Sequence, residues 1–356
     1  MNETFRDRKT LTRPAELVAS GFAAPDQAET LEAVAALYSV AVPPGVAELI
    51  ERPDDAIARQ FLPDAAELRT MPWENVDPIG DDAHQAAPGL IHRYPDRALL
   101  KLTSVCPVYC RFCFRRARVG AGTEGVLGED ALDEAFAYLS RRKEIWELIV
   151  TGGDPLAVSP RRLADLSRRI SAVEHIKILR FHSRVPALTP ERIGPELIAA
   201  LKASGKTVYV ALHANHPREL TVSAREACGS LIDAGIVMVS QTVLLRGVND
   251  DIETLSNLMR AFVETRIKPY YLHHPDLAPG TSHFRLTIEE GQALARGLLG
   301  RLSGLCQPVY VLDIPGGFGK APAGPSYFSR EADGWRVEDW RGKSHAYADL
   351  QPEKQD

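Results

Sequence analysis

The sequence lacks a basic excess, long apolar runs and low-complexity tracts. Its 356 residues carry 42 Lys and Arg against 47 Asp and Glu, a net charge of −5, whereas nucleic-acid and anionic-lipid binders carry a cationic surplus. No apolar run approaches the roughly 18 residues of a membrane span, and no apolar stretch follows the charged N-terminal residues as it would in a secretory signal. We therefore expect no nucleic-acid partner, no membrane insertion and a cytoplasmic location.

Cysteine is scarce and unevenly placed. The chain has 5 cysteines, an odd number that does not suit a disulfide framework. Three of them, Cys106, Cys110 and Cys113, crowd into one short segment. With 45% hydrophobic and 25% charged residues, the rest of the composition is that of an ordinary globular chain. The cysteines therefore point to a ligand site within an otherwise ordinary fold.

Beyond residue 98, short runs rich in β-branched residues alternate with amphipathic stretches, a pattern typical of α/β folds with a parallel sheet. Parallel strands between helices are expected to be buried on both faces. Ser159-Pro160 and Thr189-Pro190 each place a capping hydroxyl before proline and predict two helix starts. The expected strands are 98–103, 147–151, 177–181, 207–212, 236–244, 267–272 and 308–313.

The segments on either side of this pattern differ from it. Helices are expected at 26–38 and 44–50, followed by irregular, proline-containing chain, so we predict an N-terminal helical extension over 1–90. The core would span 91–320. Glycine, proline and charge after it predict a C-terminal tail, 321–356, with a frayed end. Periodicity permits either an open doubly wound sheet or a barrel, and both place the active site at the carboxyl ends of the strands.

The cysteine segment follows the first expected strand, where ligands collect. Thiolates suit iron-sulfur clusters, zinc or copper. A closed zinc site needs a fourth ligand, and no Cys or His pair with the usual spacing lies nearby. Three thiolates on a four-iron cluster would leave one iron open to a ligand. Three small buried residues at a strand end are the alternative.

Other polar residues at strand ends allow two interpretations each. Gly152 and Gly153 would let backbone approach a ligand closely, or they form an ordinary capped turn. Gln241, inside an apolar strand, needs a hydrogen-bond partner, which is either a ligand or the protein core. Lys320 follows a run of Gly and Pro and is either a Schiff-base lysine or a surface lysine.

Several motifs together resemble the radical S-adenosylmethionine (SAM) superfamily and, within it, the lysine 2,3-aminomutase family. The resemblance spans about residues 88 to 330 and implies an open partial (β/α)6 barrel of radical SAM type. The motifs that carry it include the Cys-x3-Cys-x2-Cys loop, His92–Arg97, Cys113–Arg116, Thr151–Leu156, His213–Pro217, Gln241–Asp250 and Asp313–Lys320.

The resemblance also implies three cofactors, which are a [4Fe-4S] cluster, SAM and pyridoxal 5′-phosphate (PLP). By similarity, the three cysteines hold the cluster and Lys320 is the catalytic lysine that binds PLP. The remaining roles follow in the same way: Gly152, Gly153, Asp154, His213 and Gln241 for SAM; Arg93, Tyr94 and Arg97 for PLP; Arg115 for the substrate α-carboxylate; and Asp276 and Asp313 for its ε-ammonium group.

The activity implied is an isomerase reaction, the conversion of L-lysine to β-lysine. Two carboxylates near the substrate end fit lysine better than glutamate. The absence of cysteines after Cys306 departs from the longer family members and resembles a compact form that feeds β-lysylation of elongation factor P. The family also implies a flavodoxin- or ferredoxin-type reductant and a homodimer or homotetramer. The alternatives are an aminomutase for another amino acid and a radical SAM reaction without PLP.

Overall fold

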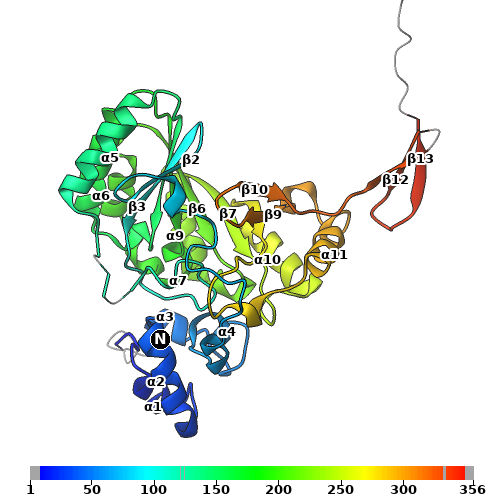
Figure 1. Cartoon of the computed structure of the whole chain (residues 1–356), viewed down its shortest axis with the longest axis horizontal. Helices are drawn as coiled ribbons and strands as arrows, with labels where there is room; N and C mark the ends of the chain where they lie inside the picture. The colour runs from blue at the N-terminus through cyan, green and yellow to red at the C-terminus, as the bar shows by residue number, and fades with distance from the viewer. Residues whose placement is uncertain (1–8, 121, 124, 332–333, 349–356) are drawn as a thin grey trace, which may run out of the picture.

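A computed structural model describes residues 9–120, 122–123, 125–331 and 334–348 (Figure 1). These residues form one ten-stranded sheet, in the order β1-β2-β3-β4-β5-β6-β7-β8-β9-β10, and a separate three-stranded sheet. Strands β3 to β9 are parallel neighbours, and antiparallel strands flank them at both edges. The parallel strands are β3 (Arg97–Thr103), β4 (Glu147–Gly152), β5 (Ile178–Ser183), β6 (Thr207–His213), β7 (Val237–Val243), β8 (Lys268–His273) and β9 (Val309–Ile314).

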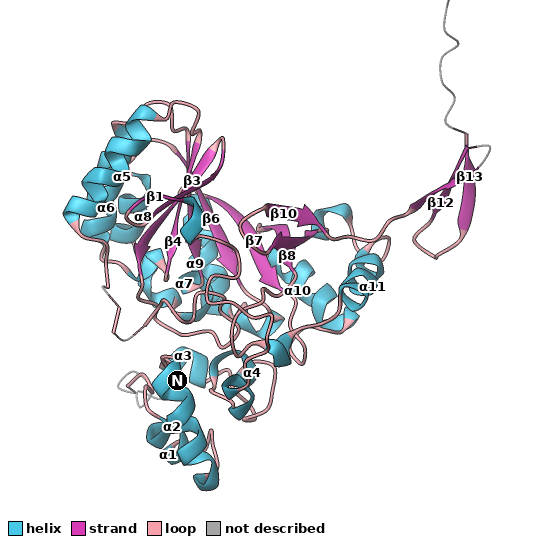
Figure 2. Ribbon diagram, viewed as in Figure 1, coloured by secondary structure: helices cyan, strands magenta, loops and turns pink. Residues whose placement is uncertain are grey.

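All seven predicted strands are confirmed. Short β-branched runs between amphipathic stretches are typical of buried strands joined by helices. Each pair of parallel neighbours is joined through a helix, which gives six strand-helix units (Figure 2). Strands β1 and β10 do not pair with each other in the described residues, so the sheet stays open. The predicted open partial barrel is therefore confirmed. The joining helices are α5 (Glu129–Arg141), α6 (Pro160–Ser171), α7 (Val185–Leu188), α8 (Pro195–Lys202), α9 (Val222–Asp233), α10 (Ile252–Glu264) and α11 (Ile288–Leu298).

Both predicted helix starts are found, but only one has the predicted cap. Helix α6 begins at Pro160, and the Ser159 hydroxyl accepts the N–H of Arg162. At Pro190 a single 3-10 turn, Pro190–Arg192, begins, but the Thr189 side chain makes no capping bond and the Thr189 N–H closes the end of α7. Helix α8 begins at Pro195, which again places proline in the first turn.

The predicted burial on both faces is found in β4, where four consecutive residues, Leu148–Thr151, are buried, but not in every strand. In β3, Ala98, Leu100 and Leu102 are fully buried in the main hydrophobic core, whereas Arg97 and Lys101 on the opposite face are only partly buried. A sheet that curls has an outer face covered by helices and an inner face that lines a cavity. The inner face carries polar side chains, which positions the site.

The N-terminal segment is helical, as predicted, up to about residue 61. Its helices are α1 (Pro14–Ala19), α2 (Ala28–Leu37), α3 (Pro44–Ala47) and α4 (Ala58–Phe61). Gln60 of α4 bonds to Arg184 and Glu219, which follow β5 and β6. Helix α4 therefore lies at the carboxyl ends of the strands.

Irregular chain was expected up to residue 90, but β1 (Gln85–Ala87) and β2 (Leu90–Tyr94) join the sheet as a hairpin. The turn at Gly89, with φ +72°, lets the two strands pair although the proline before it hides the pattern. At the other edge, β10 (Gly319–Pro322) pairs back on β9.

The C-terminal segment contains strands that the sequence did not predict, whereas the predicted frayed end falls on residues that the structure does not describe. Strands β11 (Phe328–Glu331), β12 (Gly334–Glu338) and β13 (Ser344–Tyr347) form an antiparallel sheet that stands away from the larger sheet (Figure 1). The hydrogen-bonded ladder compensates for the small burial of these strands. Residues 349–356, which the prediction also covered, lie outside the described residues. Within the described ranges no helix is long and apolar enough to cross a membrane.

Candidate active site

The three clustered cysteines lie in the loop between β3 and α5 and line one hollow. In the described part of the chain no three His, Cys, Asp or Glu side chains converge on the position of a single metal ion. Burial and the charge of the neighbouring Cys110 thiol raise the pKa of Cys113 to about 11. Burial likewise raises the pKa of Cys106 and of Cys110. Three thiols around a shared hollow are a donor set for a multi-iron cluster.

Buried arginines surround this loop. Arg184, after β5, places Nη1 3.1 Å from the sulfur of the middle cysteine and pairs with buried Glu219. Arg111 and Arg116, inside the loop, both pair with Glu67, and the Arg111 Nη2–Glu67 Oε2 distance is 2.5 Å. Arg184 acts to lower the pKa of Cys110, and Arg116 acts in the same direction on Cys113, but burial outweighs both. Sequence reasoning missed this network because its acidic members lie far away along the chain.

The glycines that end β4 allow a close approach of the chain to itself. A Cβ on Gly153 would lie closer than 3.0 Å to the Val105 carbonyl oxygen, and a Cβ on Gly152 would collide with Thr103 O. The Gly153 N–H donates to Thr103 O at 2.5 Å. These glycines therefore hold the start of the cysteine loop against the end of β4.

Asp154 caps the turn that follows. Its carboxylate accepts the N–H of Leu156 at 3.0 Å, the Ser183 hydroxyl at 2.7 Å and the Arg184 N–H at 2.7 Å. Burial raises the pKa of Asp154 despite these bonds. The turn is thus structurally satisfied, as the capped-turn alternative requires, and its role toward SAM stays a prediction.

Polar side chains gather on the inner face of β5 to β7. His213 ends β6 beside Gln241 of β7 in the parallel register. Burial lowers the pKa of His213 to about 3, although a hydrogen bond from the His213 ring to Gln241 acts in the other direction. The ring of His182, which sequence reasoning missed, lies 5.9 Å from that of His213. Two neutral imidazoles and a buried amide therefore face the interior.

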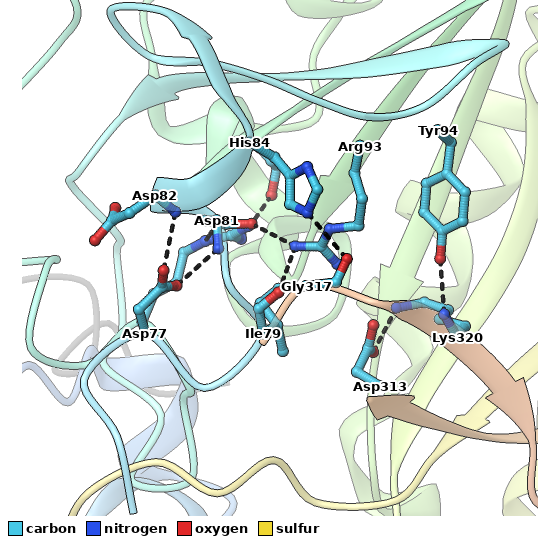
Figure 3. A network of polar contacts seen from close by, with 12 residues as sticks. Asp77, Ile79, Asp81, Asp82, His84, Arg93, Tyr94, Asp313, Gly317 and Lys320 are labelled. Atoms are coloured by element: carbon cyan, nitrogen blue, oxygen red, sulfur yellow. Dashed lines mark hydrogen bonds and ion pairs between the residues drawn. The ribbon is translucent and has the colours of Figure 1, made fainter. Parts of the chain in front are cut away.

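Lys320 lies in strand β10 and not in the irregular loop that its glycines suggested. It pairs across the hairpin with Asp313, and Lys320 Nζ lies 2.5 Å from Asp313 Oδ2 (Figure 3). The Lys320 N–H donates to the Tyr94 hydroxyl at 2.7 Å. The hairpin thus fixes this lysine at the carboxyl end of β9, where the residue is exposed, and its role stays a prediction.

The predicted PLP-phosphate residues surround the turn between β2 and β3 at Pro95, as expected. Tyr94 reaches Lys320, and the guanidinium of Arg97 lies 3.7 Å from the centre of the Tyr94 ring. Arg93 pairs with Asp81 at 3.1 Å. Tyr94 therefore contacts the Lys320 hairpin directly, from the opposite edge of the open sheet.

Two carboxyl groups lie beside Lys320. Burial and the charge of Asp313 raise the pKa of Asp276 to about 7. Burial also acts to raise the pKa of Asp313, but His273 and Lys320 outweigh it and hold that pKa at about 2. Asp313 Oδ1 and His273 Nε2 are buried without a hydrogen-bond partner among the described residues. These two atoms, Asp313 Oδ1 and His273 Nε2, can accept hydrogen bonds from a further cation.

Arg115 lies within electrostatic range of Asp276. Its side chain is buried, with Nη2 3.0 Å from Asp81 Oδ2 and Nη1 3.4 Å from the Thr151 hydroxyl. Asp81 thus touches both Arg93 and Arg115. Sequence reasoning missed Asp81, because an aspartate in a Gly-Asp-Asp turn reads as solvent-facing.

The donor sets fit the groups that the motifs imply. Thiols with cationic neighbours suit a cluster. A fixed amine on Lys320 with nearby guanidinium and hydroxyl donors suits an aldehyde cofactor that carries a phosphate. Arg93 Nε and Asp313 Oδ1 are buried polar atoms without partners in the described structure, as expected of groups that await a ligand.

Comparison with known proteins agrees with this geometry. The profile of the Radical SAM superfamily matches residues 100–259. An L-lysine 2,3-aminomutase from Acetoanaerobium sticklandii is 37% identical over 85% of this chain and 73% of its own. L-lysine 2,3-aminomutases from Fusobacterium nucleatum and Escherichia coli are 38% and 35% identical over 81% and 80% of this chain, and over 68% and 83% of their own. The chain belongs to the lysine 2,3-aminomutase family of the radical SAM superfamily.

Proposed function

We propose that this protein converts L-lysine to β-lysine by moving the amino group from Cα to Cβ. The observation that carries the proposal is the pair of buried carboxyl groups, Asp276 and Asp313, beside Lys320. Lys320 supplies one positive charge beside two buried carboxyl groups, and the ε-ammonium of lysine would supply the second. A substrate with a carboxylate at that end would meet like charge.

The family works with a [4Fe-4S] cluster, SAM and PLP. When bound, the first two supply hydrogen abstraction from an unactivated C–H bond, and PLP supplies stabilisation of the radical during nitrogen migration. We propose that Cys106, Cys110 and Cys113 hold the cluster. Gly152, Gly153, Asp154, His213 and Gln241 would contact SAM, and Arg93, Tyr94, Arg97 and Lys320 would hold PLP.

The substrate residues have distinct tasks in this proposal. Arg115 binds the α-carboxylate through its planar guanidinium. Asp313, whose pKa is about 2, stays ionised and binds ammonium at any pH of interest. Asp276, whose pKa is about 7, can gain or lose a proton near neutrality. The barrel interior excludes water, so that the radical meets one hydrogen only.

An anaerobic assay tests the proposal. Protein with measured iron and PLP content is incubated with SAM, a strong reductant and L-lysine, and β-lysine is measured by chromatography. We expect β-lysine from the wild type and at least a tenfold loss of kcat/KM in Asp276→Asn, because a charged hydrogen bond to the substrate is lost. Production of another β-amino acid, but not β-lysine, by loaded enzyme would refute the substrate. Activity that survives in Lys320→Ala would favour a radical SAM reaction without PLP.

Further assignments stay predictions. We propose a flavodoxin- or ferredoxin-type reductant, a homodimer or homotetramer, and a cytoplasmic location. The use of the product in β-lysylation of elongation factor P also stays a prediction, as does the division at residues 90 and 320 into extension, core and tail.

A further inference from the structure

Asp81 occupies a position that the family motifs do not mark. It lies before β1, outside the matched radical SAM profile, and only 3% of its surface is exposed. Its two carboxylate oxygens have different partners. Oδ1 lies 3.1 Å from Arg93 Nη2, and Oδ2 lies 3.0 Å from Arg115 Nη2. One carboxylate thus joins two arginines that come from different parts of the chain.

The segment 77–84, which contains Asp81, also contacts the hairpin that carries Lys320. The Nε2 of His84 lies 3.0 Å from Gly317 O (Figure 3). A Cβ on Gly80 would lie 2.5 Å from Gly317 N, so the two turns are in direct backbone contact. The Asp77 carboxylate accepts the N–H of Asp81 at 2.8 Å and fixes the turn. The segment 77–84 therefore touches the strand of Arg93, the loop of Arg115 and the turn before Lys320.

The charges around Asp81 do not balance. Two guanidinium groups contact its carboxylate, and the half-buried ammonium of Lys101 lies within electrostatic range. Burial acts to raise the pKa of Asp81, but Arg115, Lys101 and Arg93 outweigh it and lower that pKa, so the carboxylate is ionised. Asp81 contacts two guanidinium groups, one positive charge more than it neutralises, whereas the Lys101 ammonium is also balanced by Asp82. The surplus leaves both arginines able to bind a further anion while Asp81 restrains their positions.

We propose that Asp81 is a positioning residue that holds Arg93 and Arg115 in register, so that the phosphate end of PLP and the substrate carboxylate are placed relative to each other. This inference rests on the proposed function, which assigns those anions to the two arginines. A guanidinium on a long side chain loses rotamer freedom when it binds, and a fixed carboxylate removes that cost in advance.

The opposite role is physically distinct. If Asp81 only competed with ligand anions for the two arginines, its removal would free both guanidinium groups, and PLP and lysine would bind more tightly. If it positions them, its removal lets both side chains move and weakens both ligands. The sign of the change separates the two roles.

The test compares Asp81→Asn with Asp82→Asn in anaerobically purified enzyme with equal iron content. Asp82 is the next residue, and its partner Arg118 has no assigned role in the site, so the control removes the same charge from the same turn. PLP affinity is measured by spectroscopic titration without lysine. We expect Asp81→Asn to weaken PLP on the order of tenfold and to raise the KM for lysine more than it lowers kcat. Asp82→Asn should match the wild type.

A double-mutant cycle separates positioning from general damage. In an Arg93→Gln background, Asp81→Asn should have little further effect on PLP affinity, because its effect is carried by Arg93. Asp81→Glu keeps the charge and should recover part of the affinity. If Asp81→Asn does not fold, Asp81→Glu compared with Arg93→Gln still reports the coupling. Equal or tighter PLP binding in Asp81→Asn, or full additivity with Arg93→Gln, overturns the inference.

The two proposals fail in different ways. If the wild type makes β-lysine and binds PLP but Asp81→Asn behaves as Asp82→Asn does, only the role of Asp81 is wrong. If the loaded wild type binds PLP and makes no β-lysine, lysine is the wrong substrate, while the PLP titrations still test the coupling of Asp81 to Arg93.

Discussion

Replacement of Gly153 by alanine should damage the cysteine loop by steric contact alone. The added Cβ would lie closer than 3.0 Å to the Val105 carbonyl oxygen and 2.9 Å from Ser104 C, where ordinary contacts are 3.4–4 Å. These are backbone atoms, so the loop that leads to Cys106 must move by about half an ångström or more to restore contact distances. Overpacking of this kind costs about 1–3 kcal/mol of unfolding free energy.

Gly304→Ala is the matched control for this variant. A Cβ there would meet nothing within 4 Å, and the backbone is not in the left-handed region. We expect it to be neutral or slightly stabilising, by up to about 1 kcal/mol, because alanine has less freedom in the unfolded chain. Both variants replace glycine by alanine, but only Gly153→Ala creates a steric clash.

The assay is the urea midpoint together with iron per chain after identical reconstitution. Gly153→Ala should have the lower urea midpoint and should bind less iron, because the movement of the loop displaces Cys106 from Cys110 and Cys113. An iron content equal to that of wild type, with a midpoint equal to that of Gly304→Ala, would refute the claim that β4 and the cysteine loop are in contact.

Three further results are expected. The kcat/KM for lysine should rise with pH through about 7, because Asp276 must lose its proton to bind ammonium, and Asp276→Asn should remove this dependence. Glu67→Gln leaves Arg111 and Arg116 buried without a counter-charge, so urea unfolding should show a loss of about 3–5 kcal/mol and lower iron retention. Borohydride treatment and peptide mass spectrometry should find PLP on Lys320 in the wild type and none in Lys320→Ala; attachment at another lysine would contradict the assignment.

Local sequence determined the strands and most of the helices that join them. The seven parallel strands lie within two residues of their predicted bounds, because each is a short β-branched run buried against an amphipathic helix. The Ser159 cap is equally local. The Thr189-Pro190 pair starts only a short 3-10 turn, and the α-helix that follows begins at Pro195.

The edge strands of the sheet, β1, β2 and β10, were not predicted from the local sequence. Strands β1 and β2 are three and five residues long and are separated by Pro88 and Gly89. Strand β1 pairs with β2, and β2 pairs with β3, through short turns, so these contacts are local but the strands are too short to show a clear alternating pattern. Strand β10 likewise turns back on β9, and this pairing fixes the position of Lys320.

For the site, the sequence determined the residue types and the tertiary structure decided their partners. Cysteine spacing after a strand predicted the cluster loop, because ligands collect at the carboxyl ends of parallel strands, and the family resemblance predicted the role of Lys320. Nothing in the sequence joins Asp81 to Arg93 and Arg115, or Glu67 to the cysteine loop. Buried charges need a partner in space, and the fold brings that partner from wherever the chain passes.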